Sequence, residues 1–405
     1  MKPSLSVVMA VYNAEQYLQK SVKSILGQTF SDFEFIIIDD GSTDRSFEMI
    51  SSYDDPRIRI IQNSNNLGQT RSLNKGIDIS SGEFIARQDA DDYSDLDRFR
   101  LQVDHLKAHP EVGLLGTSYR IVDKQGNILE TVVLPESNDE LQDRLLRGNI
   151  FCHGSVMIRG DVLKMVGGYN ENFPVTQDYE LWLRLSEHAS LANLKSVLYS
   201  LRFDEGSVTR KRRTVQLSYR RLALELAEQR RRNESQSQIP EDVEARYPAE
   251  PERVAGDARW AAYLFYVSGD IAKGEDLLRL AVAVLAASPN GKPAPLLGRW
   301  NDWAITRAHA LSDQRRDVKA GEDFIKWALK IVSSDPANTR RSIARYYADR
   351  VFIADRFDES QPLIHYYLKA IMLDPAYLQN RGLLVQVWNA LRKPNEPRKR
   401  NHPSL

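Results

Sequence analysis

An apolar run that ends in two acidic residues is the feature that most restricts how this chain can fold. Residues 33–44 read FEFIIIDDGSTD. A short, nearly continuous apolar run bounded by turn residues predicts a strand that is buried on both faces, as in a parallel sheet. Gly41 permits a sharp turn after it, and we expect Ser42 or Thr43 to cap the following helix.

Asp39 and Asp40 are therefore expected at the carboxyl end of a central strand, where open α/β sheets bind their ligands. A capped strand-to-helix turn would account for a lone Asp-Gly-Ser. Two adjacent acids at a buried strand end are harder to explain in that way, because burying a charge without a partner is costly.

The composition is that of an ordinary globular protein, and the length of 405 residues indicates two or three domains. Lysine plus arginine and aspartate plus glutamate both number 55, so the overall charge favours no nucleic-acid partner. The single cysteine, Cys152, excludes an intramolecular disulfide framework and a cysteine-rich zinc site. Residues 1–11 lack the pattern of a signal peptide, and no run approaches the roughly 20 apolar residues of a membrane span. We expect a cytoplasmic protein, with the inner face of the membrane as a second location.

Strand and helix patterns alternate through the first part of the chain, which predicts a doubly wound parallel sheet. The expected strands are residues 5–11, 33–39, 58–61 and 83–87, and the expected helices are residues 17–26, 46–52 and 73–79.

A second group of carboxylates, Asp89, Asp91 and Asp92, follows the strand expected over residues 83–87. Residues i and i+2 of an extended segment point the same way, about 6–7 Å apart. Like charges so close repel, which suggests a cation beside them, and oxygen-only ligands suit Mg²⁺ or Mn²⁺. An isolated Asp-x-Asp is also common in solvated turns, but its place after a second acid-tipped strand favours a site.

Four motifs, in this order and at this spacing, resemble those of family-2 glycosyltransferases, which are inverting enzymes with the GT-A fold. They are residues 8–13, residues 39–44, residues 66–68 with Asn74, and residues 89–92. The resemblance covers about residues 4–210. It implies an α/β domain that binds a nucleotide-diphosphate sugar, with a UDP-sugar as the expected donor.

The resemblance also implies donor-binding roles. Tyr12 would lie beside the base, Ala10 and Val11 would supply backbone contacts, and Asp40 or its neighbour Asp39 would bind the base or ribose. A uracil-type base offers N–H and C=O groups that an acid and backbone groups can pair with.

On the diphosphate side, the resemblance places Arg71 near the base or diphosphate and Asp89 near the ribose and metal. It makes Asp91 the ligand of a Mn²⁺ or Mg²⁺ ion on the diphosphate. A divalent ion would neutralise the charge of that leaving group as a Lewis acid. Many relatives have a histidine where this chain has Asp204, so Asp204 is either an oxygen ligand to the metal or marks a lost contact.

Asp178 is the expected catalytic base, again by resemblance. Thr176 is expected to cap a helix, and a carboxylate in a first helical turn is favoured by the helix dipole, so a purely structural role is the alternative. The surrounding residues fit the family, although Gln177 stands where glutamate is common. The side chains expected to point inward from this helix are Tyr179, Trp182, Leu183 and Leu185. His153 would either line the acceptor site or be a structural histidine.

Residues 210–232 predict a basic helix with an apolar side, which would either lie on an anionic membrane surface or link two domains in solvent. The Gln-x-x-Arg-Trp signature of processive synthases is missing, so we expect transfer of single sugars.

From residue 253 onward the pattern is helical, and helix pairs closing on Asp-Pro resemble degenerate tetratricopeptide-like repeats. Such a domain would bind a protein partner, support self-association or pack on the catalytic domain. The expected divisions are a GT-A domain over residues 1–210, a basic helix and linker over 211–252, a helical domain over 253–391 and a disordered tail over 392–405.

The leading hypothesis is thus a metal-dependent inverting glycosyltransferase acting on a glycan or lipid-linked acceptor, in bacterial surface polysaccharide synthesis. One alternative is a nucleotidyltransferase, although the chain lacks a glycine-rich phosphate loop and Asp178 would be unexplained. The other is a catalytically weak scaffold whose helical domain binds partners, which predicts degraded acids, whereas the acids are present.

Overall fold

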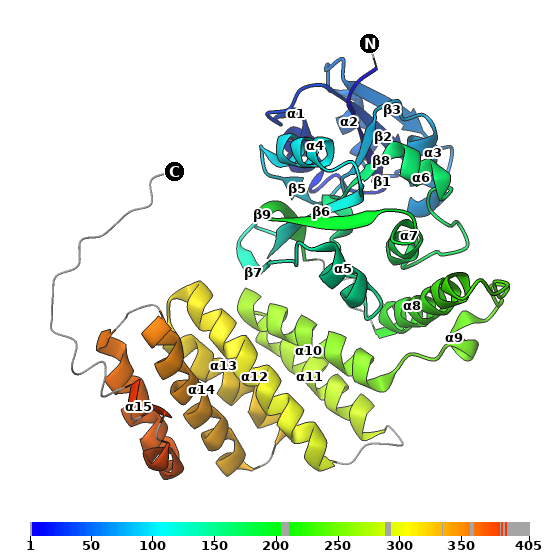
Figure 1. The fold of residues 1–405 in the computed structure, drawn as a ribbon. Coiled ribbons are helices and arrows are strands. Elements are labelled where there is room, and N and C mark those ends of the chain that lie inside the picture. Colours follow the sequence, from blue (N-terminus) through cyan, green and yellow to red (C-terminus); the bar gives the residue numbers. More distant parts are fainter. Residues whose placement is uncertain are drawn as a thin grey trace. The chain divides into compact units, whose positions relative to one another are not determined.

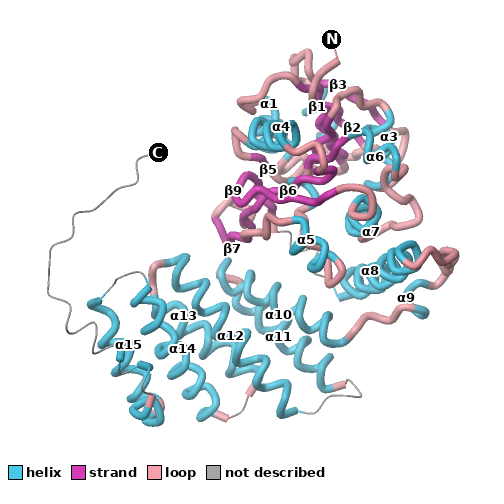
Figure 2. Tube along the Cα trace, in the orientation of Figure 1, coloured by secondary structure: helices cyan, strands magenta, loops and turns pink. Residues whose placement is uncertain are grey.

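The computed structural model describes residues 2–203, 210–287, 293–333, 335–356, 360–380, 382–383 and 385–386. The chain divides into two compact units, Met1–Val254 and Ala255–Leu405. The first unit is built on one sheet and the second is helical (Figure 2), which confirms the expected α/β domain followed by an all-α region.

Nine strands in the described residues form one sheet in the order β3-β2-β1-β4-β8-β6-β9-β5, with β7 paired to β6 (Figure 1). The strands are β1 (Leu5–Val11), β2 (Phe33–Asp39), β3 (Ile58–Gln62), β4 (Phe84–Arg87), β5 (Tyr93–Ser94), β6 (Val112–Val122), β7 (Ile128–Val132), β8 (Met157–Arg159) and β9 (Ser190–Arg202).

The part of the sheet that carries the predicted motifs is parallel. β1 lies between β2 and β4 and is parallel to both, and β2 is parallel to β3. The chain thus adds β2 and β3 on one side of β1 and then crosses to add β4 on the other, so the order reverses at β1. Beyond β4 the sheet is mixed, because β8 is antiparallel to β4 and β6, while β6 is parallel to β9.

Side chains alternate along the strands to fill two cores, one on each face of the sheet. Leu5, Val7 and Met9 of β1 pack in one core with the first group of helices, and Val8 packs in the other core with the second group. The first group is α1 (Leu18–Leu26), α2 (Ser46–Ser51) and α4 (Arg98–Ala108). The second group is α3 (Gln69–Asp78), α5 (Asn138–Leu145), α6 (Gly160–Met165), α7 (Gln177–Leu185), α8 (Arg210–Arg231) and α9 (Val243–Arg246).

Helix α8 is the basic helix expected over residues 210–232, but its apolar side is not free to lie on a membrane. Leu222, Leu226 and Ala227 are buried in the core of the N-terminal unit. Part of its charge also faces this unit, since Arg230 forms an ion pair with Glu187 at 2.9 Å. The apolar side of α8 therefore packs in this core and does not face solvent or a membrane surface.

Two predicted helix caps are also wrong. Ser42 and Thr43 do not cap α2; the carboxylate of Asp44 accepts the bond from the Ser46 amide instead, at 2.9 Å. Thr176 makes no capping bond to α7 and has a left-handed backbone, with φ of 63°. Its hydroxyl donates to the carbonyl of Gln216 in α8, so tertiary packing replaces the local cap.

The second unit consists of helices that follow one another with short connections (Figure 1). They are α10 (Pro251–Ser268), whose first four residues belong to the first unit, α11 (Ile271–Ala286), α12 (Pro293–Arg315), α13 (Val318–Val332), α14 (Pro336–Arg356), α15 (Ser360–Leu373) and the short 3-10 helix η3 (Pro375–Gln379). Asp335 and Asp374 each accept a bond from the backbone amide two residues on, so each Asp-Pro step starts a new helix. No helix in the described part of the chain is both long and apolar enough to cross a bilayer.

Candidate functional site

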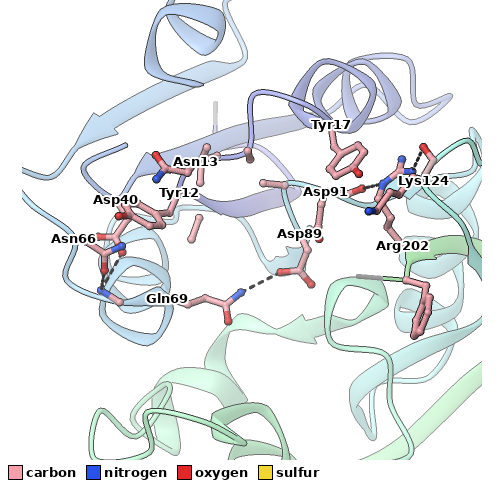
Figure 3. Close-up of a pocket in the computed structure, with 16 residues that line it drawn as sticks. Tyr12, Asn13, Tyr17, Asp40, Asn66, Gln69, Asp89, Asp91, Lys124 and Arg202 are labelled. Atoms are coloured by element: carbon pink, nitrogen blue, oxygen red, sulfur yellow. Dashed lines mark hydrogen bonds between the residues drawn. The ribbon is translucent and has the colours of Figure 1, made fainter. Parts of the chain in front are cut away.

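A cavity of about 530 Å³ lies at the carboxyl ends of β1, β2 and β4, beside the point where the strand order reverses (Figure 3). This is the position at which open α/β sheets bind ligands. Predicted site residues that line it are Ala10, Val11, Tyr12, Asp40, Asp89 and Asp91. Further residues in the lining include Asn13, Tyr17, Asn66, Gly68, Gln69, Lys124, Arg202 and Phe203.

The first acidic pair separates into two environments. Asp40 lines the cavity, and its carboxylate accepts hydrogen bonds from the backbone amides of Leu67 and Gly68, both at 2.9 Å. It therefore holds the loop that precedes α3. Asp39 is fully buried and lies outside the cavity lining. It accepts a hydrogen bond from the side-chain amide of Gln62 at 3.3 Å. Tyr12, by contrast, is 48% exposed at the cavity and is free to contact a flat ligand.

Gly41 makes the turn after this pair possible. Its φ of 71° is in the left-handed region, and a Cβ added there would lie 2.6 Å from the backbone of Asn65. The close approach of these two loops places Asp40 beside the loop that it holds, as the sharp turn predicted from the sequence requires.

Asp89 is neutralised by a buried arginine. The Nη2 atom of Arg87 lies 2.6 Å from Asp89 Oδ1, and Arg87 is completely buried. Burial raises the pKa of Asp89, but Arg87, together with His153 and Arg98, outweighs it and holds the pKa below the usual range. Asp89 is therefore ionised at neutral pH, and its Oδ1 atom is already paired with Arg87.

Asp92 has a structural position. It is 1% exposed and accepts bonds from the Tyr199 hydroxyl at 2.9 Å and from the Arg202 amide at 2.7 Å. Burial first, and then the charges of Asp91 and Asp89, raise its pKa well above the ordinary value. Asp92 thus fastens the end of β9 to the loop after β4, rather than facing the cavity.

Asp91 lines the cavity together with Asp89. Among the described residues, no group of three histidine, cysteine, aspartate or glutamate side chains is placed to hold a metal ion. A Mg²⁺ or Mn²⁺ ion that uses one or two carboxylates and takes its other ligands from substrate phosphates and water remains compatible with this donor set. Asp204, the third predicted ligand, lies outside the described residues.

Two cationic residues on the cavity wall were missed by the sequence reasoning. Arg202 ends β9, lies 4.1 Å over the ring of Tyr17 and donates to the carbonyls of Asp91 and Asp123. Lys124 follows in the turn between β6 and β7. Arg202 could have been noticed because it lies two residues before Asp204, in the segment compared with the family pattern. A single arginine, however, is not by itself evidence of a binding site.

Arg71 does not line the cavity. Its side chain is 58% exposed and forms an ion pair with Glu171 at 3.2 Å, on the outer face of α3. The first residue of this helix, Gln69, is the one that enters the lining.

Asp178 lies in the first turn of α7 and is not part of the cavity lining. Asn149 Nδ2 donates to its Oδ2 atom at 2.6 Å, and among the described residues no hydrogen bond reaches its Oδ1 atom. The inward residues predicted for this helix are fully buried, and they fix its position: Tyr179, Trp182, Leu183 and Leu185.

His153 joins the two sides of the site. It belongs to the short 3-10 helix η1 (His153–Ser155), and its Nε2 atom lies 3.2 Å from Arg87 Nε and 2.7 Å from the Tyr169 hydroxyl. Burial, reinforced by the charge of Arg87, lowers the pKa of His153 to about 4, so the ring is neutral at pH 7. Its ring nitrogen is an acceptor for Arg87, which supports a structural role. The alternative role of His153, lining the site of the sugar acceptor, stays a prediction.

Comparison with known proteins places the N-terminal unit among glycosyltransferases. Residues 6–164 match the family model "Glycosyl transferase family 2". The chain is 34% identical over 215 residues to "Putative glycosyltransferase EpsE" of Bacillus subtilis (strain 168), which spans 52% of this chain and 76% of that protein. It is 30% identical over 212 residues to "Amylovoran biosynthesis glycosyltransferase AmsE" of Erwinia amylovora, over 51% of this chain and 79% of that one.

A more distant likeness extends over both units. The solved structure of TarS 1–349 of S. aureus aligns with 94% of this chain and 92% of its own at 15% identity, with a TM-score of 0.46. A likeness at that score assigns neither a donor nor an acceptor.

Proposed function

Because the chain belongs to glycosyltransferase family 2, we propose that it transfers a sugar from a nucleotide-diphosphate donor, a UDP-sugar, to a hydroxyl of a glycan or lipid-linked acceptor, with inversion at the anomeric carbon. The observation that carries the proposal is the convergence of Tyr12, Asp40, Asp89 and Asp91 on one cavity at the carboxyl ends of parallel strands. Tyr12 would stack on the base, and the region around Asp40 would bind base and ribose.

On the diphosphate side, Asp91 would hold a Mn²⁺ or Mg²⁺ ion, which when bound supplies charge neutralisation for the leaving group. Arg202 and Lys124 lie on the same wall and would add positive charge there. Asp89 would contact the donor with its charge already balanced by Arg87.

Asp178 would act as the general base. As the acceptor oxygen forms its bond to the anomeric carbon, the bond from that carbon to the diphosphate oxygen breaks, and the acceptor's proton passes to a carboxylate oxygen of Asp178. Asn149 holds Oδ2, so the oxygen that it leaves available would take the proton. General-base catalysis of this kind is worth about 10²–10⁴ in rate.

The role in surface polysaccharide synthesis is proposed from the relatives. AmsE is named for amylovoran biosynthesis, and its similarity covers 51% of this chain. The helical unit is proposed to bind a partner or a second copy.

The test is release of the nucleoside diphosphate from a panel of nucleotide-diphosphate sugars with Mn²⁺. We expect Asp178→Asn to lower kcat by about 10²–10⁴ and Asp91→Asn to abolish the stimulation by Mn²⁺. The matched control is Asp139→Asn, which removes an exposed carboxylate from the first turn of α5 and should leave the rate unchanged. Full activity in both site variants would contradict these assignments.

A further inference from the structure

Two glutamine side chains form a bridge from the cavity to the helix that carries Asp178. Gln69 is the first residue of α3 and Gln177 is the first residue of α7. Gln69 Nε2 donates to Asp89 Oδ1 at 3.2 Å (Figure 3), and Gln177 Nε2 donates to Gln69 Oε1 at 3.0 Å. The hydrogen bonds therefore run in one direction, from α7 through α3 to Asp89.

The charge on Asp89 sets this direction. Asp89 forms an ion pair with Arg87 at 2.6 Å, and an ionised carboxylate only accepts hydrogen bonds. Gln69 must then turn its amide nitrogen toward Asp89 and its amide oxygen toward α7. Whatever side chain stands at position 177 has to donate to that oxygen. Gln69 is exposed, but Gln177 is only 8% exposed, so a carboxylate in its place would have little contact with water.

A carboxylate at position 177 would break the bridge. It would place a second acceptor against Gln69, whose single amide nitrogen cannot serve acceptors on opposite sides at once. The helix dipole alone would favour a carboxylate at this first-turn position. The amide at this position therefore follows from the partner side chain and not from the helix.

We propose that Gln69 and Gln177 are positioning residues, which fix the first turn of α7, and with it Asp178, relative to Asp89 and the donor cavity. This inference rests on the proposed function, in which Asp178 is the base. The other contact that orients Asp178, from Asn149, comes from a residue outside the cavity lining, whereas the bridge connects the base with the donor side.

The decisive variant is Gln177→Glu, assayed for nucleoside-diphosphate release across pH. We expect kcat to fall about 10- to 100-fold at pH 8 with little change in donor KM, because orientation is lost and the donor contacts remain. The ratio of variant to wild-type kcat should rise as the pH falls, since a protonated carboxyl group at position 177 donates as the amide does. Taking the ratio removes the titrations that the two proteins share.

A compensating change tests the pairing directly. Gln69→Lys puts a donor-only group between positions 89 and 177, so the double variant Gln69→Lys with Gln177→Glu should regain most of the lost kcat. The matched control is Gln142→Glu, which removes an amide that donates to the Ser186 carbonyl at 2.9 Å, away from the cavity. We expect it to lower Tm without changing kcat or the pH profile.

The outcomes separate the two proposals. If Gln177→Glu keeps the wild-type kcat while Asp178→Asn is inactive, the bridge alone is overturned. The bridge is also overturned if Gln177→Glu loses kcat and neither a lower pH nor the added Gln69→Lys substitution restores it. A fully active Asp178→Asn contradicts the base assignment instead. If the wild type releases a nucleoside diphosphate from none of the donors tested, Tm still tests the bridge. The Tm of Gln177→Glu should be lower than that of the wild type, and this difference should become smaller as the pH falls. A Tm difference that does not change with pH overturns the inference.

Discussion

The three carboxylates after β4 show how position decides the role of a single residue type. Asp89 is paired with Arg87, Asp92 is buried with a raised pKa, and Asp91 lines the cavity. The sequence predicted the cluster, because acids crowded at a strand end are unusual. It could not divide their roles, since the division depends on Arg87 and on Tyr199 of β9, which lies 107 residues from Asp92.

Gly154 is a residue at which the packing around this cluster can be tested. A Cβ on Gly154 would lie 1.8 Å from the Tyr199 hydroxyl and 2.9 Å from Asp89 Oδ2. We expect Gly154→Ala to destabilise the protein by about 1–3 kcal/mol through overpacking and to lower activity. The measurement is urea unfolding beside a turnover assay.

Gly256→Ala serves as the control for that change. This position is in helix α10, and the nearest atom to an added Cβ is 3.9 Å away. Alanine should stabilise a helix interior by about 0.5–1 kcal/mol relative to glycine. If the two substitutions had the same effect on unfolding, the close packing around Tyr199 would be in doubt.

His153 predicts a specific dependence of stability on pH. Its pKa of about 4 in the folded protein is below the ordinary value of 6.5, because burial and Arg87 disfavour the charged ring. The unfolded chain therefore takes up this proton at higher pH than the folded one. Stability from this residue is present above pH 6.5 and is lost as the pH falls toward 4, by at most about 3 kcal/mol.

The comparison is urea unfolding of wild type and His153→Gln at pH 7.5 and 4.5. Glutamine keeps an acceptor for Arg87 but does not titrate, so its loss of stability on acidification should be smaller. The charge that His153 gains also acts on Asp89, so the difference reports the histidine together with its effect on that carboxylate. An equal pH dependence in the two proteins would show that the histidine is not held neutral.

At the scale of elements, the sequence pattern predicted strands and helices that have a clear local signal. It missed features that depend on packing against residues distant in the chain. The buried strands at residues 5–11 and 33–39 were predicted because continuous apolar runs have few other uses. β9 was not predicted, although it is 13 residues long, because serine, asparagine and lysine interrupt its apolar pattern. The basic helix α8 was predicted as a helix, but its environment was not.

Helix α8 belongs to the N-terminal unit, and truncating its side chains should show this. Leu222 is completely buried in the core around α7, whereas Leu224 is only partly buried. Leu222→Ala should cost about 2–5 kcal/mol of unfolding free energy, and Leu224→Ala should cost clearly less. Equal, small costs in urea unfolding would mean that α8 is not packed as described.

At the scale of the whole molecule, the chain combines two compact units. One is a two-faced sheet with the cavity, and the other is a series of helices. The family match lies within the first unit, at residues 6–164. A change from strand–helix alternation to helix alone is visible in the sequence. The sequence predicted a helical domain from residue 253, and the structure divides the chain after Val254; α8 and α9, expected in a separate segment, lie in the first unit.

The two units should respond differently to a donor. Calorimetry of the full chain with a UDP-sugar and Mn²⁺ should raise the Tm of one transition and leave the other unchanged. A ligand at 100 times its Kd adds about 2.7 kcal/mol to the state that binds it. A shift of both transitions together would show that the units unfold as one, and no shift with any nucleotide sugar would count against the proposed donor site.

The paired glutamines also limit the order in which this site can evolve. With Gln69 in place, a carboxylate at position 177 meets an acceptor, so under the proposed bridge we expect that substitution to lower activity when it comes first. Lysine at position 69 still donates to Asp89, and Gln177 can turn its oxygen toward it, so this step can come first without a mismatch. A lineage could then accept the acid at 177 without loss. The two hydrogen bonds, at 3.2 and 3.0 Å, thus favour the order in which position 69 changes before position 177 over the opposite order.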